Sequence, residues 1–181
     1  MLELGFGTGE LLIEMAERGW QVCGLEPSAA MHRVTARKMR RRGVWAPRVR
    51  GYAEALPFAD ASLDAVVATF PAGYILSPAT WQEAARVLHR PEPGSGTPGG
   101  RLIVAGLFFE IGGPPLRHMG QGPHDPCGSR LLQRCRELAG SSGFHFSLIR
   151  EERGRFRVPL LVMEKGSPGQ SALEEGHGRH A

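Results

Sequence analysis

The stretch Met1-Leu2-Glu3-Leu4-Gly5-Phe6-Gly7-Thr8-Gly9 decides the fold of this chain. A short apolar strand runs into three glycines at alternate positions, and the helical pattern of residues 10–18 follows at once. Because glycine has no side chain, backbone N–H groups in such a turn can approach a ligand closely. The dinucleotide fingerprint G-x-G-x-x-G requires a third glycine at position 10, where this chain has Glu10. The stretch therefore predicts a nucleotide-cofactor turn of another kind, with an ordinary tight turn as the alternative.

The residues after this turn complete one half of a doubly wound sheet. Residues 21–25 form a short apolar strand that ends at Glu26. In a unit of strand, glycine turn, helix and strand, the two strands run parallel and their carboxyl ends meet at one crevice. A carboxylate at that place accepts the hydroxyls of a ribose. The alternative for Glu26 is a simple contribution to a helix start, since Pro27 and Ser28 follow.

Two further signals lie downstream. Residues 51–68 read Gly-Tyr-Ala-Glu-Ala-Leu-Pro-Phe-Ala-Asp-Ala-Ser-Leu-Asp-Ala-Val-Val-Ala, between a predicted strand over 48–51 and an apolar run over 65–70. That run is typical of a parallel strand buried on both faces. Later, Arg86-Val87-Leu88 lies in a predicted helix over 81–89, and Gly99-Gly100-Arg101-Leu102 opens the next strand. The Pro- and Gly-rich residues 91–98 between them predict a surface loop.

These signals, in this order, resemble the class I S-adenosylmethionine-dependent methyltransferases, and among them the type 11 enzymes that modify quinones and other small molecules. The family's motifs are E-x-G-x-G-x-G, then G-D-A-E-x-L-P-F-x-D-x-S-F-D-x-V, then R-V-L-x-P-G-G-x-L. The chain departs from them at Tyr52, where the family usually has an aspartate that bonds the adenine amino group. It departs again at Phe6, where a small or thiol residue is common. The resemblance extends over residues 1–164.

The resemblance implies the fold and the domain organisation. We expect an α/β, Rossmann-like, doubly wound and mostly parallel sheet of seven strands, with helices on both faces and the last strand antiparallel. Further helices are predicted over 28–42 and 129–139, and further strands over 144–150 and 156–164. The helical spacing predicts that the helix over 28–42 buries Ala29, Met31, Val34 and Ala36 or Met39. One methyltransferase domain would cover residues 1–166, without the helices that family members carry before the first strand. Residues 167–181 would be a disordered tail.

The resemblance also implies a cofactor, S-adenosyl-L-methionine, and direct in-line methyl transfer to a small-molecule acceptor without a covalent nucleophile. The glycines would hold the methionine part, Glu26 the ribose, and Ala53 with Glu54 the adenine. Phe70 and Tyr74 would face the sulfonium, with core packing as the alternative for Phe70. The full set of cofactor-binding residues would be Glu3, Gly5, Gly7, Gly9, Glu26, Pro27, Ala53, Glu54 and Thr69. The candidates for a general base, which the sequence does not rank, are Tyr74, Glu110, His118 and His124.

The charge pattern admits another kind of partner. The net charge is +4, from 22 basic and 18 acidic residues, and much of the excess lies in Arg37-Lys38-Met39-Arg40-Arg41-Arg42. Cations at a helix C-terminus complement the helix dipole, and Gly43 follows as a C-cap, so we expect a solvated helix end there. Nucleic-acid binding is the less favoured interpretation, because no aromatic residues interleave with these cations.

Other features argue against whole classes of protein. No apolar run approaches the roughly 20 residues of a membrane helix, and Met1 opens a strand rather than a signal peptide. We therefore expect a cytoplasmic protein with no membrane partner. The 3 cysteines have no C-x-x-C spacing, which argues against a disulfide framework. No metal is expected either, because the polar run His118, His124, Asp125 and Cys127 has no standard ligand spacing.

Two alternative functions stay open from the sequence. One is a module that binds S-adenosylmethionine but has lost catalysis and acts as a partner or regulator. The other is a nicotinamide-dependent oxidoreductase, which Glu26 favours and Glu10 disfavours because it breaks the dinucleotide spacing.

Overall fold

The computed structural model describes residues 1–92, 98–107, 110–111, 126–153 and 156–166. Its strands are β1 (Leu2–Leu4), β2 (Cys23–Leu25), β3 (Arg48–Val49), β4 (Ala65–Thr69), β5 (Arg101–Ala105), β6 (Glu110–Ile111), β7 (Phe144–Arg153) and β8 (Phe156–Lys165). Its helices are α1 (Glu10–Glu17), α2 (Ala29–Arg42), the 3-10 helix η1 (Gly73–Leu76), α3 (Pro78–Val87) and α4 (Pro126–Ser141). Every strand and helix predicted from the sequence is present, with ends that differ by a few residues. The predicted tail over 167–181 lies outside the described residues.

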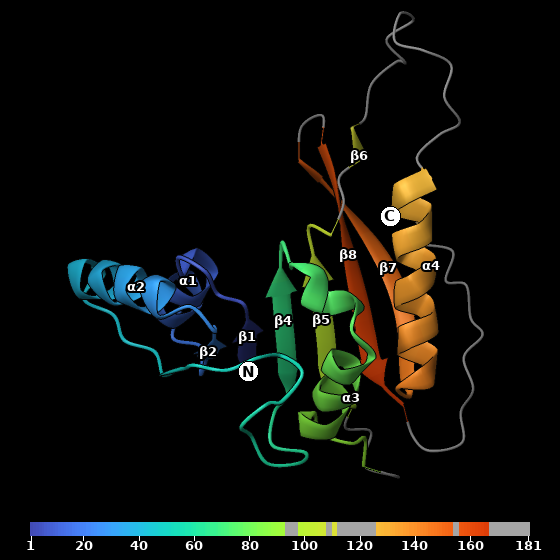
Figure 1. Ribbon diagram of the computed structural model, residues 1–181, viewed down its shortest axis with the longest axis horizontal. Helices are drawn as coiled ribbons and strands as arrows, with labels where there is room; N and C mark the ends of the chain where they lie inside the picture. The colour runs from blue at the N-terminus through green and yellow to red at the C-terminus, as the bar shows by residue number, and fades with distance from the viewer. Residues whose placement is uncertain (93–97, 108–109, 112–125, 154–155, 167–181) are drawn as a thin grey trace, which may run out of the picture.

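One sheet carries the domain (Figure 1). Its strand order is β3-β2-β1-β4-β5-β8-β6, with β7 also paired to β8. The pairs from β3 through β5 are parallel, and β8 runs antiparallel to its neighbours β5, β6 and β7. The Rossmann-like, mostly parallel sheet with an antiparallel last strand is therefore confirmed. The two-residue strand β6 is an addition to the predicted sheet.

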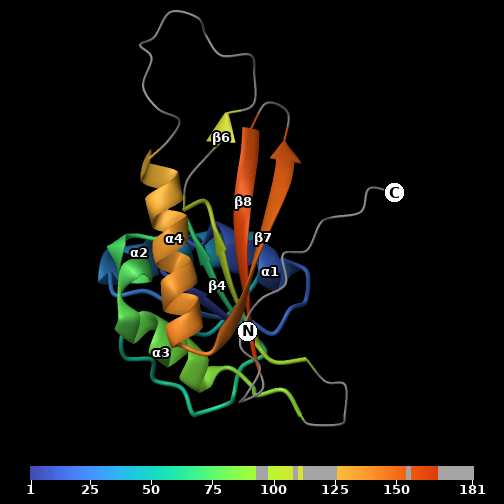
Figure 2. The same cartoon turned by 90° about the vertical axis from the view of Figure 1, so that its right-hand side faces the viewer.

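Helices cover both faces of the sheet, as predicted (Figure 2). α3 and α4 lie on one face, where Trp81 and Leu138 pack against the strand residues Leu2, Val66 and Leu161. On the other face, α1 and α2 enclose a smaller core made of Phe6, Leu12, Ile13, Met15, Val22, Met39 and Ala46. None of the helices in the described part of the chain is long and apolar enough to cross a membrane.

The buried side of α2 differs from its prediction. Met39 is buried, as one of the predicted alternatives had it. The other fully buried residue is Thr35, whereas Ala29, Met31, Val34 and Ala36 are only partly buried. Thr35 is tolerated there because its hydroxyl donates a hydrogen bond to the carbonyl oxygen of Gly7, at 3.2 Å. The C-terminus agrees with its prediction: three arginines fill the last turn and Gly43 caps it with φ +67°.

The last strand joins the two halves of the chain. β8 lies between β5 and β7, so the last of the described strands in sequence is an interior strand of the sheet. At its end, the Lys165 ammonium donates hydrogen bonds to the carbonyl oxygens of Ala85 and Leu88. These are orphan carbonyls at the C-terminus of α3, so a residue of the second half caps a helix of the first half.

Candidate functional site

The parallel strands end side by side at one edge of the sheet. Leu4 of β1 pairs with Leu25 of β2 and with Ala68 of β4, and Leu25 pairs with Val49 of β3. The glycine turn, Glu26, the loop after β3 and the end of β4 therefore leave the sheet next to one another. This is the edge at which open α/β sheets bind their ligands.

The three glycines of the turn all adopt the left-handed conformation. Their φ angles are +65° at Gly5, +51° at Gly7 and +79° at Gly9. The N–H of Gly5 donates to the carbonyl oxygen of Leu25 at 2.8 Å, which holds the turn against β2. Gly9 caps α1 without a side-chain hydrogen bond, so the first N–H groups of this helix have no capping side chain. The turn thus brings backbone donors and the positive end of a helix dipole to the sheet edge.

Glu26 links this turn to the start of α2. Its carboxylate is 9% exposed, and Oε2 accepts a hydrogen bond from the N–H of Gly7 at 3.2 Å. Oε1 accepts one from the N–H of Ser28 at 2.9 Å. The side-chain N-cap of α2 is Ser28 itself, whose Oγ accepts from the N–H of Met31. Each oxygen of Glu26 keeps a second lone pair, so the carboxylate can still accept hydrogen bonds from a ligand's hydroxyls.

Glu3 is a buried carboxyl group beneath α1. The residue is 2% exposed, and Oε2 has no hydrogen-bond partner among the residues that the structure describes. Burial raises the pKa of Glu3 to about 7, and a hydrogen bond from the N–H of Leu12 opposes that rise. A buried acceptor without a hydrogen-bond partner is uncommon in folded proteins. The inner wall of the glycine turn is therefore polar at Glu3.

Tyr74 of η1 lies over the glycine turn. Its hydroxyl donates to the carbonyl oxygen of Leu4 at 3.1 Å, and a Cβ added to Gly5 would lie 2.9 Å from that hydroxyl. Burial, followed by the charges of Glu26, Glu3 and Glu54, raises the pKa of Tyr74 above its usual value. A phenol that stays protonated and donates its proton to a carbonyl is a poor general base, so the structure argues against that role for Tyr74.

Phe70 follows β4 at the same edge. Its φ angle is +47°, which is unusual for a residue other than glycine, and the residue is 68% exposed. The alternative of core packing for Phe70 is therefore wrong. Residues in such strained conformations concentrate at functional sites.

The structure describes some of the other predicted site residues and not others. Thr69 ends β4 half-buried, Ala53 is buried in the loop after β3, and Glu54 beside it is exposed. Pro27 is exposed, and its carbonyl oxygen accepts hydrogen bonds from Arg50. The candidate bases His118 and His124 lie outside the described residues, and so does Asp125; Glu110 and Cys127 are described only as members of β6 and α4. Within the described ranges, no group of three His, Cys, Asp or Glu could hold a metal ion.

Arg86 of α3 holds the loop after β3, a role that the sequence analysis did not assign. Its guanidinium donates to the carbonyl oxygens of Leu56 at 2.9 Å and Phe58 at 2.8 Å, and to Asp60 Oδ1 at 2.7 Å. Both Glu83 oxygens accept from Arg86 at 2.8 Å, and Glu83 Oε2 also accepts from the N–H of Leu56. The arginine in Arg86-Val87-Leu88 was the available signal, because a planar donor fork suits several acceptors at once.

We expect Arg86→Ala to loosen this loop. The substitution removes five hydrogen bonds and leaves loop carbonyls unpaired, and because Arg86 is partly exposed the expected loss is about 2 kcal/mol of unfolding free energy. Urea unfolding measures this loss, and hydrogen exchange of the Leu56 amide reports the loop directly. The matched control is Arg134→Ala on α4, whose ion pair with Glu137 is exposed and 3.5 Å long. Equal stability of the two variants would contradict this role.

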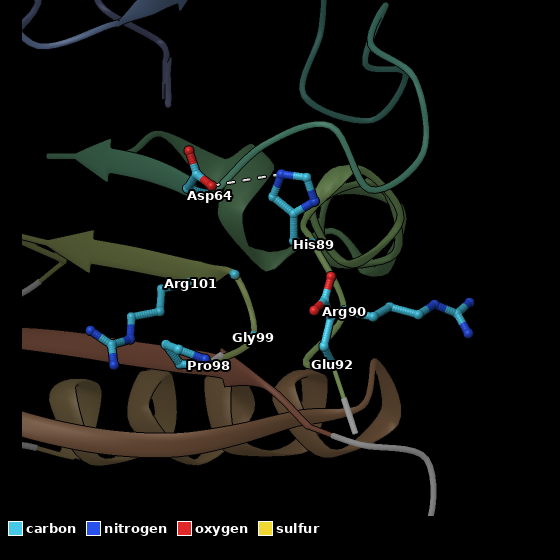
Figure 3. Close-up of a pocket in the computed structure, with 8 residues that line it drawn as sticks. Asp64, His89, Arg90, Glu92, Pro98, Gly99 and Arg101 are labelled. Atoms are coloured by element: carbon cyan, nitrogen blue, oxygen red, sulfur yellow. Dashed lines mark ion pairs between the residues drawn. The ribbon is translucent and has the colours of Figure 1, made fainter. Parts of the chain in front are cut away.

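A cavity of about 440 Å³ lies at the opposite edge of the sheet (Figure 3). Asp64 precedes β4 and Arg101 begins β5, so this is the edge where these strands start. His89 Nε2 lies 3.6 Å from Asp64 Oδ1, and Arg101 pairs with Glu164 at 3.1 Å. The lining residues are Asp64, His89, Arg90, Glu92, Pro98, Gly99, Gly100 and Arg101. None of them belongs to the glycine turn or to the residues around it.

Comparison with known protein families decides what kind of domain this is. The family described as "Methyltransferase domain" matches residues 1–91, from the glycine turn through α3. The chain belongs to the methyltransferase domain family. This result confirms the resemblance inferred from the sequence motifs, and the match includes all the predicted cofactor-binding residues.

Curated relatives share part of this methyltransferase domain. An uncharacterized methyltransferase of Geobacillus kaustophilus is 34% identical over 113 residues, which cover 60% of this chain and 47% of the relative. The demethylmenaquinone methyltransferase of Thermus thermophilus is 35% identical over 106 residues, which cover 58% of this chain and 45% of the relative. The chain thus spans about half the length of the curated relatives it matches.

Solved structures share the fold of the methyltransferase domain. The YcgJ protein of Bacillus subtilis superposes with a TM-score of 0.64 at 14% identity, covering 92% of this chain and 91% of that protein. Geranyl diphosphate C-methyltransferase from Streptomyces coelicolor gives a TM-score of 0.64 at 13% identity, covering 91% and 71%. At these identities the likeness concerns the fold alone.

Proposed function

We propose that this methyltransferase domain binds S-adenosyl-L-methionine at the glycine turn and transfers its methyl group to a small-molecule acceptor. The observation that carries the proposal is the Glu26 carboxylate, which bonds the N–H groups of Gly7 and Ser28 at the carboxyl edge of the sheet. That bridge fixes a carboxylate beside a turn of left-handed glycines, at the place where such folds hold a ribose.

The residues present fit this cofactor. An added Cβ at Gly7 would meet only the Gly5 carbonyl oxygen, at 3.9 Å, so the turn is open on that side. The unpartnered Oε2 of Glu3 supplies a buried acceptor behind the turn. Besides burial, the charges of Glu26 and Glu54 contribute to raising the pKa of Tyr74, so this edge of the sheet carries negative charge. A negative edge suits a ligand that carries an ammonium and a sulfonium group.

The protein's part in the reaction is binding and orientation. S-adenosyl-L-methionine supplies an activated methyl group on a positively charged sulfur. The glycine turn and Glu26 would hold the two ends of the cofactor, while Tyr74 and the exposed ring of Phe70 would border its centre. The site must then hold the acceptor in line with the methyl group, about 3 to 3.5 Å away, and exclude water. No covalent nucleophile is needed for this transfer.

A small molecule is the acceptor class that the relatives favour. The name of the Thermus thermophilus relative gives demethylmenaquinone as that protein's substrate. The Streptomyces coelicolor structure contains geranyl diphosphate, another small molecule. Demethylmenaquinone is therefore the first acceptor to test here.

Calorimetric titration of S-adenosylhomocysteine into the purified chain tests the cofactor site. We expect micromolar binding, and we expect Glu26→Gln to weaken it by roughly 10- to 100-fold, because a ribose would lose its carboxylate and the Gly7 and Ser28 N–H groups would meet an amide. The matched control is Glu14→Gln, an exposed residue of α1 that pairs with Arg18.

The outcomes separate the proposal from its alternatives. Equal affinity of the wild-type chain and Glu26→Gln would contradict the proposed site. Binding of a reduced nicotinamide cofactor without S-adenosylhomocysteine binding would restore the oxidoreductase interpretation. Cofactor binding without transfer of a radiolabelled methyl group to any small-molecule acceptor would favour the inactive module.

A further inference from the structure

Two of the three tryptophans are exposed on the molecular surface. Trp20 is 54% exposed and Trp45 is 74% exposed. The third, Trp81, is fully buried and donates its indole N–H to the carbonyl oxygen of Ile75 at 2.7 Å. An indole is the largest side chain that a fold can bury, so two exposed indoles on one small domain indicate a surface that contacts something else.

The two exposed tryptophans lie at neighbouring places. Trp20 follows α1 and Trp45 follows α2, each just after a glycine turn that ends the helix. The ends of these helices are held together by the ion pair between Glu17 and Arg42, at 3.5 Å. Each tryptophan comes three residues after one partner of this pair. Their flanking residues Met15, Val22, Met39 and Ala46 pack into one core.

Exposed arginines lie along α2, the helix that ends shortly before Trp45. Arg33, Arg37, Arg40 and Arg41 are exposed, and no ion pair joins any of them to another residue in the described part of the chain. Their spacing of four, three and one residues puts them along one side of the helix. The acidic residues of the neighbouring helix are already neutralised, because Glu10, Glu14 and Glu17 pair with Lys38, Arg18 and Arg42.

We propose that one end of this helix pair, made of Trp20, Trp45, Arg40 and Arg41 and here called the tryptophan end, docks the protein on an anionic lipid surface. Indoles favour the boundary between lipid headgroups and acyl chains, and arginines beside them favour negatively charged headgroups. The proposal is independent of the proposed function. Docking leaves the glycine turn free, because the helices α1 and α2 end at the opposite edge of the sheet from that turn.

The observations favour a lipid surface over a nucleic acid. A single strand is bound by aromatic rings with cations between them that track the phosphates. Here Arg42, the cation that joins the two helix ends, is already paired with Glu17, and the exposed arginines without an ion pair among the described residues follow α2. Two exposed indoles and the two arginines of the last turn of α2, all close to the ends of the two helices, suit a flat interface. The sequence analysis predicted a solvated helix end here and no membrane partner, because the sequence does not show that Trp20 and Trp45 follow helices whose ends are joined by an ion pair.

Vesicle binding of the full chain tests the proposal. We expect co-sedimentation with vesicles of phosphatidylcholine and phosphatidylglycerol but not with phosphatidylcholine alone, and weaker binding as salt is added. Tryptophan emission should shift to shorter wavelength on binding. Because Trp81 is already buried, that shift reports Trp20 and Trp45. We expect Arg40→Gln/Arg41→Gln to weaken binding roughly 30-fold and Trp45→Ala roughly 10-fold.

The control removes the same charge from another helix. Arg130→Gln/Arg134→Gln alters two exposed arginines of α4 and should leave vesicle binding unchanged. Circular dichroism confirms that each variant is folded. Equal loss in both double variants, binding to neutral vesicles alone, or no binding to anionic vesicles would overturn the proposal. Tighter binding to a single-stranded oligonucleotide, with quenched tryptophan emission and no vesicle binding, would assign the tryptophan end to nucleic acid instead.

Discussion

Gly9→Ala is expected to cost about 4 kcal/mol of unfolding free energy. A Cβ at position 9 would lie 2.3 Å from Thr35 Cγ2 and 2.8 Å from its hydroxyl, so α2 must move away from the glycine turn. Overpacking of this kind costs about 1–3 kcal/mol, and a φ angle of +79° adds about 1–2 kcal/mol for any L-amino acid side chain. Urea unfolding measures the sum.

A double-mutant cycle with Thr35→Ala separates the two costs. Removing the threonine methyl and hydroxyl leaves its Cβ as the nearest atom, at 3.1 Å, so most of the steric clash disappears while the strain in φ remains. We expect the double variant to lose less stability than the two single variants added together, by about 1–2 kcal/mol. Strict additivity would mean that the glycine is required for its backbone conformation alone.

The second large effect concerns the buried Glu3 and depends on pH. The pKa of Glu3 rises from 4.5 to about 7 on folding, so between these values the folded protein binds more protons than the unfolded chain. Unfolding free energy therefore falls as pH rises through this window and is constant above it. Glu3→Gln has no carboxyl group to ionise at this position, so its unfolding free energy does not fall in this way as pH rises. We expect it to gain up to about 3 kcal/mol over the wild-type protein between about pH 4 and about pH 8.

Urea unfolding of both proteins at the two pH values gives this difference. Any fixed cost of the new amide group is the same at both pH values and cancels. Glu14→Gln changes an exposed carboxyl group of α1 and should show no comparable change with pH. A stability gap between wild type and Glu3→Gln that does not vary with pH would mean that the pKa of Glu3 is the same in the folded and unfolded states, so that burial does not raise it.

Much of the site was predictable because it depends on backbone geometry. Glycines at alternate positions after a short apolar strand require a turn with positive φ, and Glu26 follows at the end of the next strand; all of this was confirmed as geometry. The order of strands and the antiparallel β8 came from the family resemblance rather than from spacing. The ligand roles of these residues stay predictions.

Contacts between distant side chains could not be predicted. Helical spacing suggested apolar residues for the buried side of α2, whereas Thr35 is buried because Gly7 offers a carbonyl partner twenty-eight residues away in sequence. Arg86 is an ordinary helix residue until the loop carbonyls of Leu56 and Phe58 are seen in front of it. The two exposed indoles of the tryptophan end are separated by twenty-four residues, so only the folded chain shows that they are neighbours.

The interior position of β8 sets the order in which this domain can be completed during synthesis. β8 leaves the ribosome after every other strand that the structure describes, yet β5 and β7 both need it as a hydrogen-bonding partner. Until Lys165 has emerged, β5 presents an unpaired edge and α3 lacks its C-terminal cap. Open strand edges of this kind are where nascent chains associate with one another. The nascent chain is therefore most exposed to aggregation, and most dependent on chaperones, during the interval between the synthesis of β5 and that of β8.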